Sequence, residues 1–250
     1  MCCAGPQCPT AGPPPYAVFE LTPKTVVGLP GVAGTGEGQP ASFRATRWRF
    51  KEDQMRKLIV SEFITLDGVI QSPGYPDEDP SGGFEAGGWQ QRYFDDVFGR
   101  AVIEGLAASG GLLLGRRTYE SFAGFWPKQP ADDPLAPIIN GLPKYVASTT
   151  LTEPLGWENS HLLQGDVAQA VGELKAQDGK DLRVIGSGEL VQTLMEQDLV
   201  DEYALMIHPL VVGGGKRLFR DGNPGTSLRL VESTTTSTGV LIVSYVPADR

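Results

Sequence analysis

The sequence predicts an α/β domain of three layers, in which a mostly parallel central sheet has helices on both faces and ends in a C-terminal antiparallel hairpin. Two observations predict it. From residue 57 to residue 209, short apolar strands alternate with segments of helical periodicity, as in parallel sheets. The last two expected strands, 226–235 and 239–246, follow each other without a helix between them, which indicates an antiparallel edge.

Composition limits the class of protein. The chain has 250 residues, a formal charge of −9 and 40% hydrophobic residues, which suits one globular domain with an appendage. The acidic balance argues against nucleic acid as a partner, because phosphate backbones require basic patches. No apolar run reaches the roughly 18 residues of a transmembrane helix. We therefore expect a cytoplasmic protein that binds a small molecule, with neither nucleic acid nor membrane as a partner.

Residues 1–54 differ from the rest of the chain. They hold 8 of the 20 prolines and 7 of the 32 glycines, and that density without a period is typical of disorder. All three cysteines (Cys2, Cys3 and Cys8) lie there with no histidine nearby, so the sequence predicts no metal site. We expect 1–54 to be a disordered extension, with a start-site artefact as an alternative origin, and 55–250 to be the folded domain.

The remaining elements follow from apolar spacing. A first strand at 57–65 leads into a loop at 71–88 rich in Pro, Gly, Asp and Glu, and a loop of this length is often a lid. An apolar stripe predicts a helix over 89–108. The further strands are expected at 111–114, 144–148, 162–163, 181–185 and 202–209, and the further helices at 134–142 and directly after residues 115, 166 and 188.

The stretch at 182–191 reads as a buried strand, a glycine turn and a helix. Glycines at 186 and 188 permit a sharp turn and close approach of a ligand, and the helix start offers free N–H groups to a phosphate. An ordinary strand-to-helix turn is the alternative. The dinucleotide fingerprint is excluded because Val191 replaces its third glycine, and a P-loop at 213–216 because Leu210 and Arg217 break its pattern.

Four segments with candidate ligand-binding residues each follow an expected strand, at 66–70, 115–118, 148–150 and 186–188. Ligands of open α/β sheets bind outside the carboxyl ends of the strands. Arginine in the second segment and hydroxyls in the third suit phosphate and ribose, although a solvated arginine pair and hydroxyl-capped turns are the alternatives. Their convergence favours a nucleotide site.

Five motifs in this order carry a family resemblance: Leu66–Ile70, Leu114–Glu120, Pro143–Leu151, Val184–Gly188 and Pro209–Gly215. With them, the stretch 55–246 resembles the dihydrofolate reductase superfamily, and within it the branch that contains the bacterial riboflavin-biosynthesis reductase domain. The resemblance implies a dihydrofolate reductase-like fold and NADPH as the cofactor. It also implies homodimers, which no feature of this sequence decides.

The resemblance also implies roles for individual residues. Those at the adenosine end are Gly115, Arg116, Arg117 and Thr118 at the phosphates, and Ser148 and Thr149 beside the 2′-phosphate and adenine. Those at the other end are Ile185, Gly186, Ser187 and Gly188 at the pyrophosphate, and the backbone around Phe63 and Ile70 at the nicotinamide.

The catalytic carboxylate is left open between two positions. Asp95 (or Asp96) lies early in the expected helix, where dihydrofolate reductases carry an acid, and Asp67 lies close to the expected nicotinamide site. A surface acid and a turn aspartate are the respective alternatives. Near the expected cleft, His208 is a further candidate for substrate contact, and Lys216 with Arg217 for a substrate phosphate.

Taken together, these features predict an NADPH-dependent reductase. It would transfer hydride to a small heteroaromatic or ribosylamino-pyrimidine substrate, as in riboflavin biosynthesis, and the cofactor would carry the chemistry. Dihydrofolate reduction is less favoured, because the loop at 71–88 is longer than in the pterin enzymes. A non-catalytic NADPH-binding module or sensor is the alternative.

Overall fold

The computed structural model describes residues 26–27, 47–48, 55–223 and 225–248. Contacts divide the chain into two units, Met1–Asp53 and Gln54–Arg250. In the first, β1 (Val26–Val27) pairs antiparallel with β2 (Arg47–Trp48). The three cysteines and most of the extension predicted to be disordered lie outside the described residues, so that prediction stays open.

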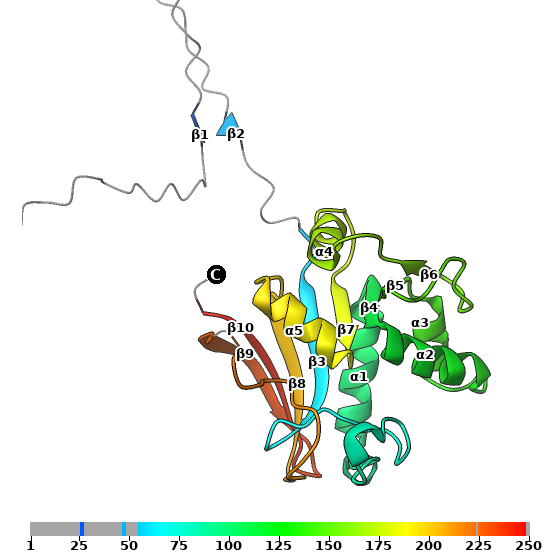
Figure 1. Cartoon of the computed structure of the whole chain (residues 1–250). Coiled ribbons are helices and arrows are strands. Elements are labelled where there is room, and N and C mark those ends of the chain that lie inside the picture. The colour runs from blue at the N-terminus through cyan, green and yellow to red at the C-terminus, as the bar shows by residue number, and fades with distance from the viewer. Residues whose placement is uncertain (1–25, 28–46, 49–54, 224, 249–250) are drawn as a thin grey trace, which may run out of the picture. The chain divides into compact units, whose positions relative to one another are not determined.

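The second unit is built on one eight-stranded sheet with the order β6-β5-β4-β7-β3-β8-β10-β9 (Figure 1). The strands from β6 to β8 are parallel, and β10 pairs antiparallel with both β8 and β9. The predicted fold class is therefore confirmed. The strand bounds are β3 Leu58–Thr65, β4 Gly111–Gly115, β5 Lys144–Ala147, β6 Ser160–Leu162, β7 Leu182–Ile185, β8 Glu202–His208, β9 Leu228–Thr235 and β10 Leu241–Pro247.

Helices cover both faces of the sheet. On one face lie α4 (Val167–Lys175) and α5 (Gly188–Glu196), and on the other lie α1 (Asp96–Ala108), α2 (Arg116–Phe125) and α3 (Ala136–Gly141). None of the helices in the described part of the chain is both long and apolar enough to cross a bilayer.

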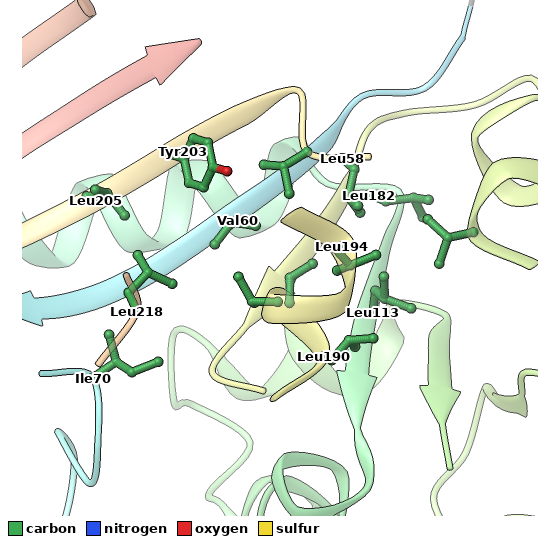
Figure 2. Close-up of a cluster of buried hydrophobic side chains, with 14 of the residues drawn as sticks. Leu58, Val60, Ile70, Leu113, Leu182, Leu190, Leu194, Tyr203, Leu205 and Leu218 are labelled. Atoms are coloured by element: carbon green, nitrogen blue, oxygen red, sulfur yellow. The ribbon is translucent and has the colours of Figure 1, made fainter. Parts of the chain in front are cut away.

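The period-two alternation of β4 decides which side chains meet which helices. Leu113 packs with Leu190 and Leu194 of α5, in the cluster that Figure 2 shows around that helix. Leu112 and Leu114 point the other way and pack with Tyr119 of α2. All three leucines are fully buried, so β4 is held by apolar packing on both faces.

The helix predicted over 89–108 starts later, and that prediction is corrected here. A 3-10 turn, η3 (Gln91–Tyr93), comes first, and α1 begins at Asp96. The reason is the Asp95 side chain, which accepts a hydrogen bond from the Phe98 backbone N–H at 2.8 Å and so caps the helix. The aromatic side chain of Trp89 instead packs edge-on against His208.

The loop at 71–88 is folded onto itself. It contains a 3-10 turn, η2 (Ser81–Gly83). The Trp89 indole N–H donates to the Gln71 carbonyl at 2.8 Å, and the Gln71 amide donates to the carbonyls of Asp79 and Ser81 at 2.9 Å each. The lid function predicted for this loop stays a prediction.

Candidate functional site

The sheet order brings the four predicted ligand segments to one edge. The strands β5, β4, β7 and β3 are consecutive neighbours and parallel. The segments that follow them (148–150, 115–118, 186–188 and 66–70) therefore lie side by side at the carboxyl edge. The helices α2 and α5 both begin at this edge.

Two hydrogen bonds join the starts of α2 and α5. The Gly115 backbone N–H donates to the Ser187 hydroxyl at 2.9 Å, and the Ser187 backbone N–H donates to the Thr118 hydroxyl oxygen at 3.0 Å. Gly186 lies at φ +56°, and a Cβ there would come within 3.3 Å of Thr118. Glycine is required at this turn both for its backbone angle and for the close approach.

Ile70 closes the same turn from the side of β3. A Cβ on Gly188 would meet the Cδ1 atom of Ile70 at 3.1 Å and Arg220 at 3.7 Å. Arg220 forms a bidentate ion pair with Glu189 on the first turn of α5, at 2.7 and 3.0 Å. Sequence reasoning missed Arg220, because it lies in a loop without a motif.

The residues predicted at the adenosine end lie nearer the surface. Arg116 bonds Glu120 one helical turn away at 3.1 Å, while Arg117 is exposed and close enough to Glu189 to lower the pKa of that carboxyl. The Ser148 hydroxyl accepts hydrogen bonds from two backbone N–H groups of its own turn, and Thr149 is exposed. Their predicted cofactor contacts stay predictions.

Asp67 holds the glycine loop at 209–217. Its carboxylate accepts hydrogen bonds from the Thr65 hydroxyl at 2.6 Å and from the backbone N–H groups of Val212 and Gly213 at 3.2 and 2.8 Å. These bonds, the one from Thr65 above all, lower the pKa of Asp67 to about 2. Asp67 is thus ionised at neutral pH and is an acceptor there, not a proton donor.

Asp95 lies at the same end of the sheet, at the start of α1 beside the turn between β9 and β10, and both of its carboxylate oxygens accept hydrogen bonds. One oxygen caps α1, and the other accepts from the backbone N–H and hydroxyl of Ser237 at 2.8 and 2.6 Å. These bonds lower its pKa, the Ser237 hydroxyl most strongly. These contacts give Asp95 a structural role, and the catalytic role predicted for it stays a prediction.

Phe63 and His208 lie together in a buried aromatic cluster. Their ring centroids are 6.1 Å apart, and His208 is fully buried among Trp89, Tyr93 and Phe98. Burial lowers the pKa of His208, so it is neutral at physiological pH. This environment favours a core histidine over the predicted substrate contact.

Two pockets flank the glycine loop. One, of about 730 Å³, lies between residues 86–92 and residues 210–212, and the other, of about 480 Å³, lies between residues 81–86 and residues 212–216. Val212, whose N–H is bonded to Asp67, lines both. Lys216 lines the second pocket but is paired with Asp79 at 2.6 Å.

Sequence reasoning also missed Glu62. It is 4% exposed, on the face of β3 that carries the buried Val60 and Ile64. The available signal was a charged residue at an inward position of an otherwise apolar strand. Across the described ranges, no group of three or more His, Cys, Asp or Glu side chains lies together as a metal site would require.

Comparison with known families decides the family of this fold. The model of the RibD C-terminal domain matches residues 56–242. The chain belongs to the RibD C-terminal domain family. The dihydrofolate reductase-like resemblance of the sequence is thereby confirmed in its riboflavin-biosynthesis branch.

Three similar proteins each cover about three quarters of this chain. The uncharacterised protein YyaP of Bacillus subtilis is 29% identical over 200 residues, covering 77% of this chain and 95% of its own length. A putative riboflavin biosynthesis protein of Shewanella has a TM-score of 0.54 at 25% identity, with 76% of this chain and 98% of that chain covered. A pyrimidine reductase-like protein of Corynebacterium diphtheriae has a TM-score of 0.50 at 12% identity, covering 77% and 92%, and shows the fold alone.

Proposed function

We propose that the protein is an NADPH-dependent reductase that transfers hydride to a small heteroaromatic substrate of the ribosylamino-pyrimidine type. Membership of the RibD C-terminal domain family supports a reductase-like role. The observation that carries the proposal is the joined start of α2 and α5 at the carboxyl edge, where Gly186 and Gly188 let Thr118 and Ile70 pack closely against the turn.

The residues at this edge suit a dinucleotide. Two helix N-termini attract phosphate through their free N–H groups and dipoles. The Thr118 hydroxyl accepts from Ser187 and keeps its proton for a phosphate oxygen, since no acceptor for it occurs among the described residues. Arg117 is exposed beside the start of α2 and suits a 2′-phosphate. NADPH, when bound, supplies the hydride.

The substrate belongs in the two pockets beside the glycine loop. Their volumes suit a small molecule. The Asp67 carboxylate is not among their lining residues, but it binds the N–H of Val212, which lines both. We assign Asp67 the role of fixing this loop beside the substrate, since its two oxygens already accept from Thr65, Val212 and Gly213. The name of the Shewanella protein supports a substrate of the riboflavin-biosynthesis type. Homodimer formation and a cytoplasmic location stay predictions.

Thermal unfolding of the full chain with NADPH or NADH tests the cofactor. Ligand at 100 times its Kd adds about 2.7 kcal/mol, which raises Tm by roughly 5–10 °C for a domain of this size. We expect this shift with NADPH and a much smaller one with NADH. Absence of a shift with either nucleotide at millimolar concentration would overturn the proposal.

Turnover is the second test. NADPH oxidation followed by absorbance, with a panel of ribosylamino-pyrimidines and other heteroaromatics, should identify the compound that accepts the hydride and is reduced. Binding of NADPH without oxidation on any member of the panel would instead support the non-catalytic binding module.

A further inference from the structure

Glu62 lies directly under the glycine turn at 186–188. On β3, Ser61 is paired in register with Ile185, the last residue of β7. The next residue, Glu62, is therefore level with Gly186. The Gly186 backbone N–H is close enough to the Glu62 carboxyl group to offset part of the rise in its pKa that burial causes. Its neighbours on the same face, Val60 and Ile64, belong to the apolar cluster that packs against α5. The carboxyl group thus sits at the N-terminal end of α5, where the dinucleotide is proposed to bind.

This carboxyl group lacks a complete set of partners. Oε1 is buried and has no hydrogen-bond partner within the described part of the chain. An ionised carboxylate buried in this way is strongly disfavoured, so the group takes up a proton. Burial raises the pKa of Glu62 well above its ordinary value, and the Gly186 N–H offsets this only partly.

The charged groups around Glu62 reinforce its protonated state. Glu78, from the loop at 71–88, raises the pKa of Glu62 by repulsion. The Glu78 carboxylate accepts two backbone N–H bonds, from Gly74 at 2.7 Å and Tyr75 at 3.3 Å. The other charged groups near the turn are of two kinds. Glu189 is paired with Arg220 and Lys216 is paired with Asp79, whereas Arg117 is exposed.

A protonated acid at this place differs from an apolar residue in one respect: it offers an O–H donor to a ligand above it. A phosphate bound at the α5 terminus would repel an ionised Glu62 but would be compatible with the neutral acid. A proton on Glu62 and a dinucleotide on the turn therefore favour each other, and by linkage each must strengthen the binding of the other.

We propose that Glu62 is a proton-carrying member of the dinucleotide site, whose neutral carboxyl group is required when the phosphates of NADPH bind over Gly186. The inference rests on the proposed function. It assigns to Glu62 the positioning of the cofactor rather than a role in the hydride transfer itself.

Isothermal titration calorimetry of NADPH in pairs of buffers with different ionisation enthalpies measures how many protons the protein takes up for each NADPH that binds. From neutral to alkaline pH, proton uptake per NADPH bound should rise from near zero toward one in the wild type. The affinity should fall by up to about tenfold per pH unit above the pKa of Glu62. The 2′-phosphate cannot mimic this result, because its second pKa is about 6 and binding as a dianion releases protons.

Two variants locate the effect. Glu62→Gln keeps a neutral donor, so we expect NADPH to bind with no proton uptake and, well above the phosphate pKa of about 6, with an affinity independent of pH. Glu78→Gln removes the repulsive neighbour but keeps Glu62, so uptake should persist and begin at a lower pH. Uptake that is unchanged in Glu62→Gln would overturn the inference, and so would NADPH binding by the wild type with no uptake across the whole pH range. Absence of binding by every variant at every pH would overturn the proposed function, and the inference with it.

Discussion

Replacing Thr118 by valine tests the contact that joins α2 to α5. Valine has the same shape as threonine but no hydroxyl, so the Ser187 backbone N–H loses the acceptor that it now reaches at 3.0 Å. Ser187 is also held at φ +59°, a left-handed conformation that costs a non-glycine residue roughly 1–2 kcal/mol. Its turn therefore depends on the few bonds that fix it.

The size of the effect follows from that lost bond. A partly buried N–H left without a partner costs about 1–3 kcal/mol, and 2 kcal/mol lowers Tm by about 4–8 °C in a domain of this length. The lost hydroxyl donor to a phosphate should also raise the Kd for NADPH by roughly tenfold or more.

Thermal unfolding and titration with NADPH measure both quantities on the same sample. Thr118→Ser is the matched control, since it keeps the hydroxyl and should stay close to the wild type in NADPH affinity. Equal Tm and equal affinity for the valine and serine variants would refute the reasoning. A lower Tm with unchanged NADPH affinity would restrict Thr118 to a structural role.

Three further predictions follow from other positions. Gly186→Ala should abolish NADPH binding. Gly165→Ala is the control, since Gly165 is also at positive φ but has nothing within 4 Å of the added Cβ, and it should lower only Tm. Equal losses of NADPH binding by the two variants in titrations would contradict this. Because the pKa of Asp67 is lowered from 3.8 to about 2, the stability difference between wild type and Asp67→Asn should be full above about pH 4 and vanish as pH falls toward 2 in denaturant titrations. The raised pKa of Glu62 gives stability the opposite dependence on pH. Without ligand, the free energy of unfolding should fall by up to about 1.4 kcal/mol per pH unit as pH rises from 4.5 toward that pKa. The same slope in Glu62→Gln would contradict this assignment.

Much of the fold could be predicted because its signals are local. The alternation of apolar strands with helical periodicity placed each main strand within a few residues, and the glycines at 186 and 188 marked the turn between β7 and α5. The start of α1 could not be read in this way. The aromatic residues at 89–94 have helical spacing, but the cap supplied by Asp95 and the packing of Trp89 on His208 override it.

The side-chain chemistry of the site was harder to predict than its location. Sequence placed Asp67 at the edge but not its bonds to Val212 and Gly213, which are 145 and 146 residues away. Arg220 comes to α5 from a loop without any pattern. Whether a carboxyl such as Glu62 is ionised depends on burial, and burial is a property of the assembled sheet.

The long sequence separation of the contacts at the carboxyl edge has a consequence for how the protein is made. The bond from the Gly115 N–H to Ser187 spans 72 residues, that from the Ser187 N–H to Thr118 spans 69, and that from Arg217 to the Asp67 carbonyl spans 150. The central strand β3 is synthesised first, yet its partners β7 and β8 emerge from the ribosome much later. Pairings of such high contact order form slowly, and a nascent chain that ends before residue 208 lacks part of the sheet. Nucleotide affinity should therefore arise only at the end of folding, so that NADPH acts as a reporter of the completed chain.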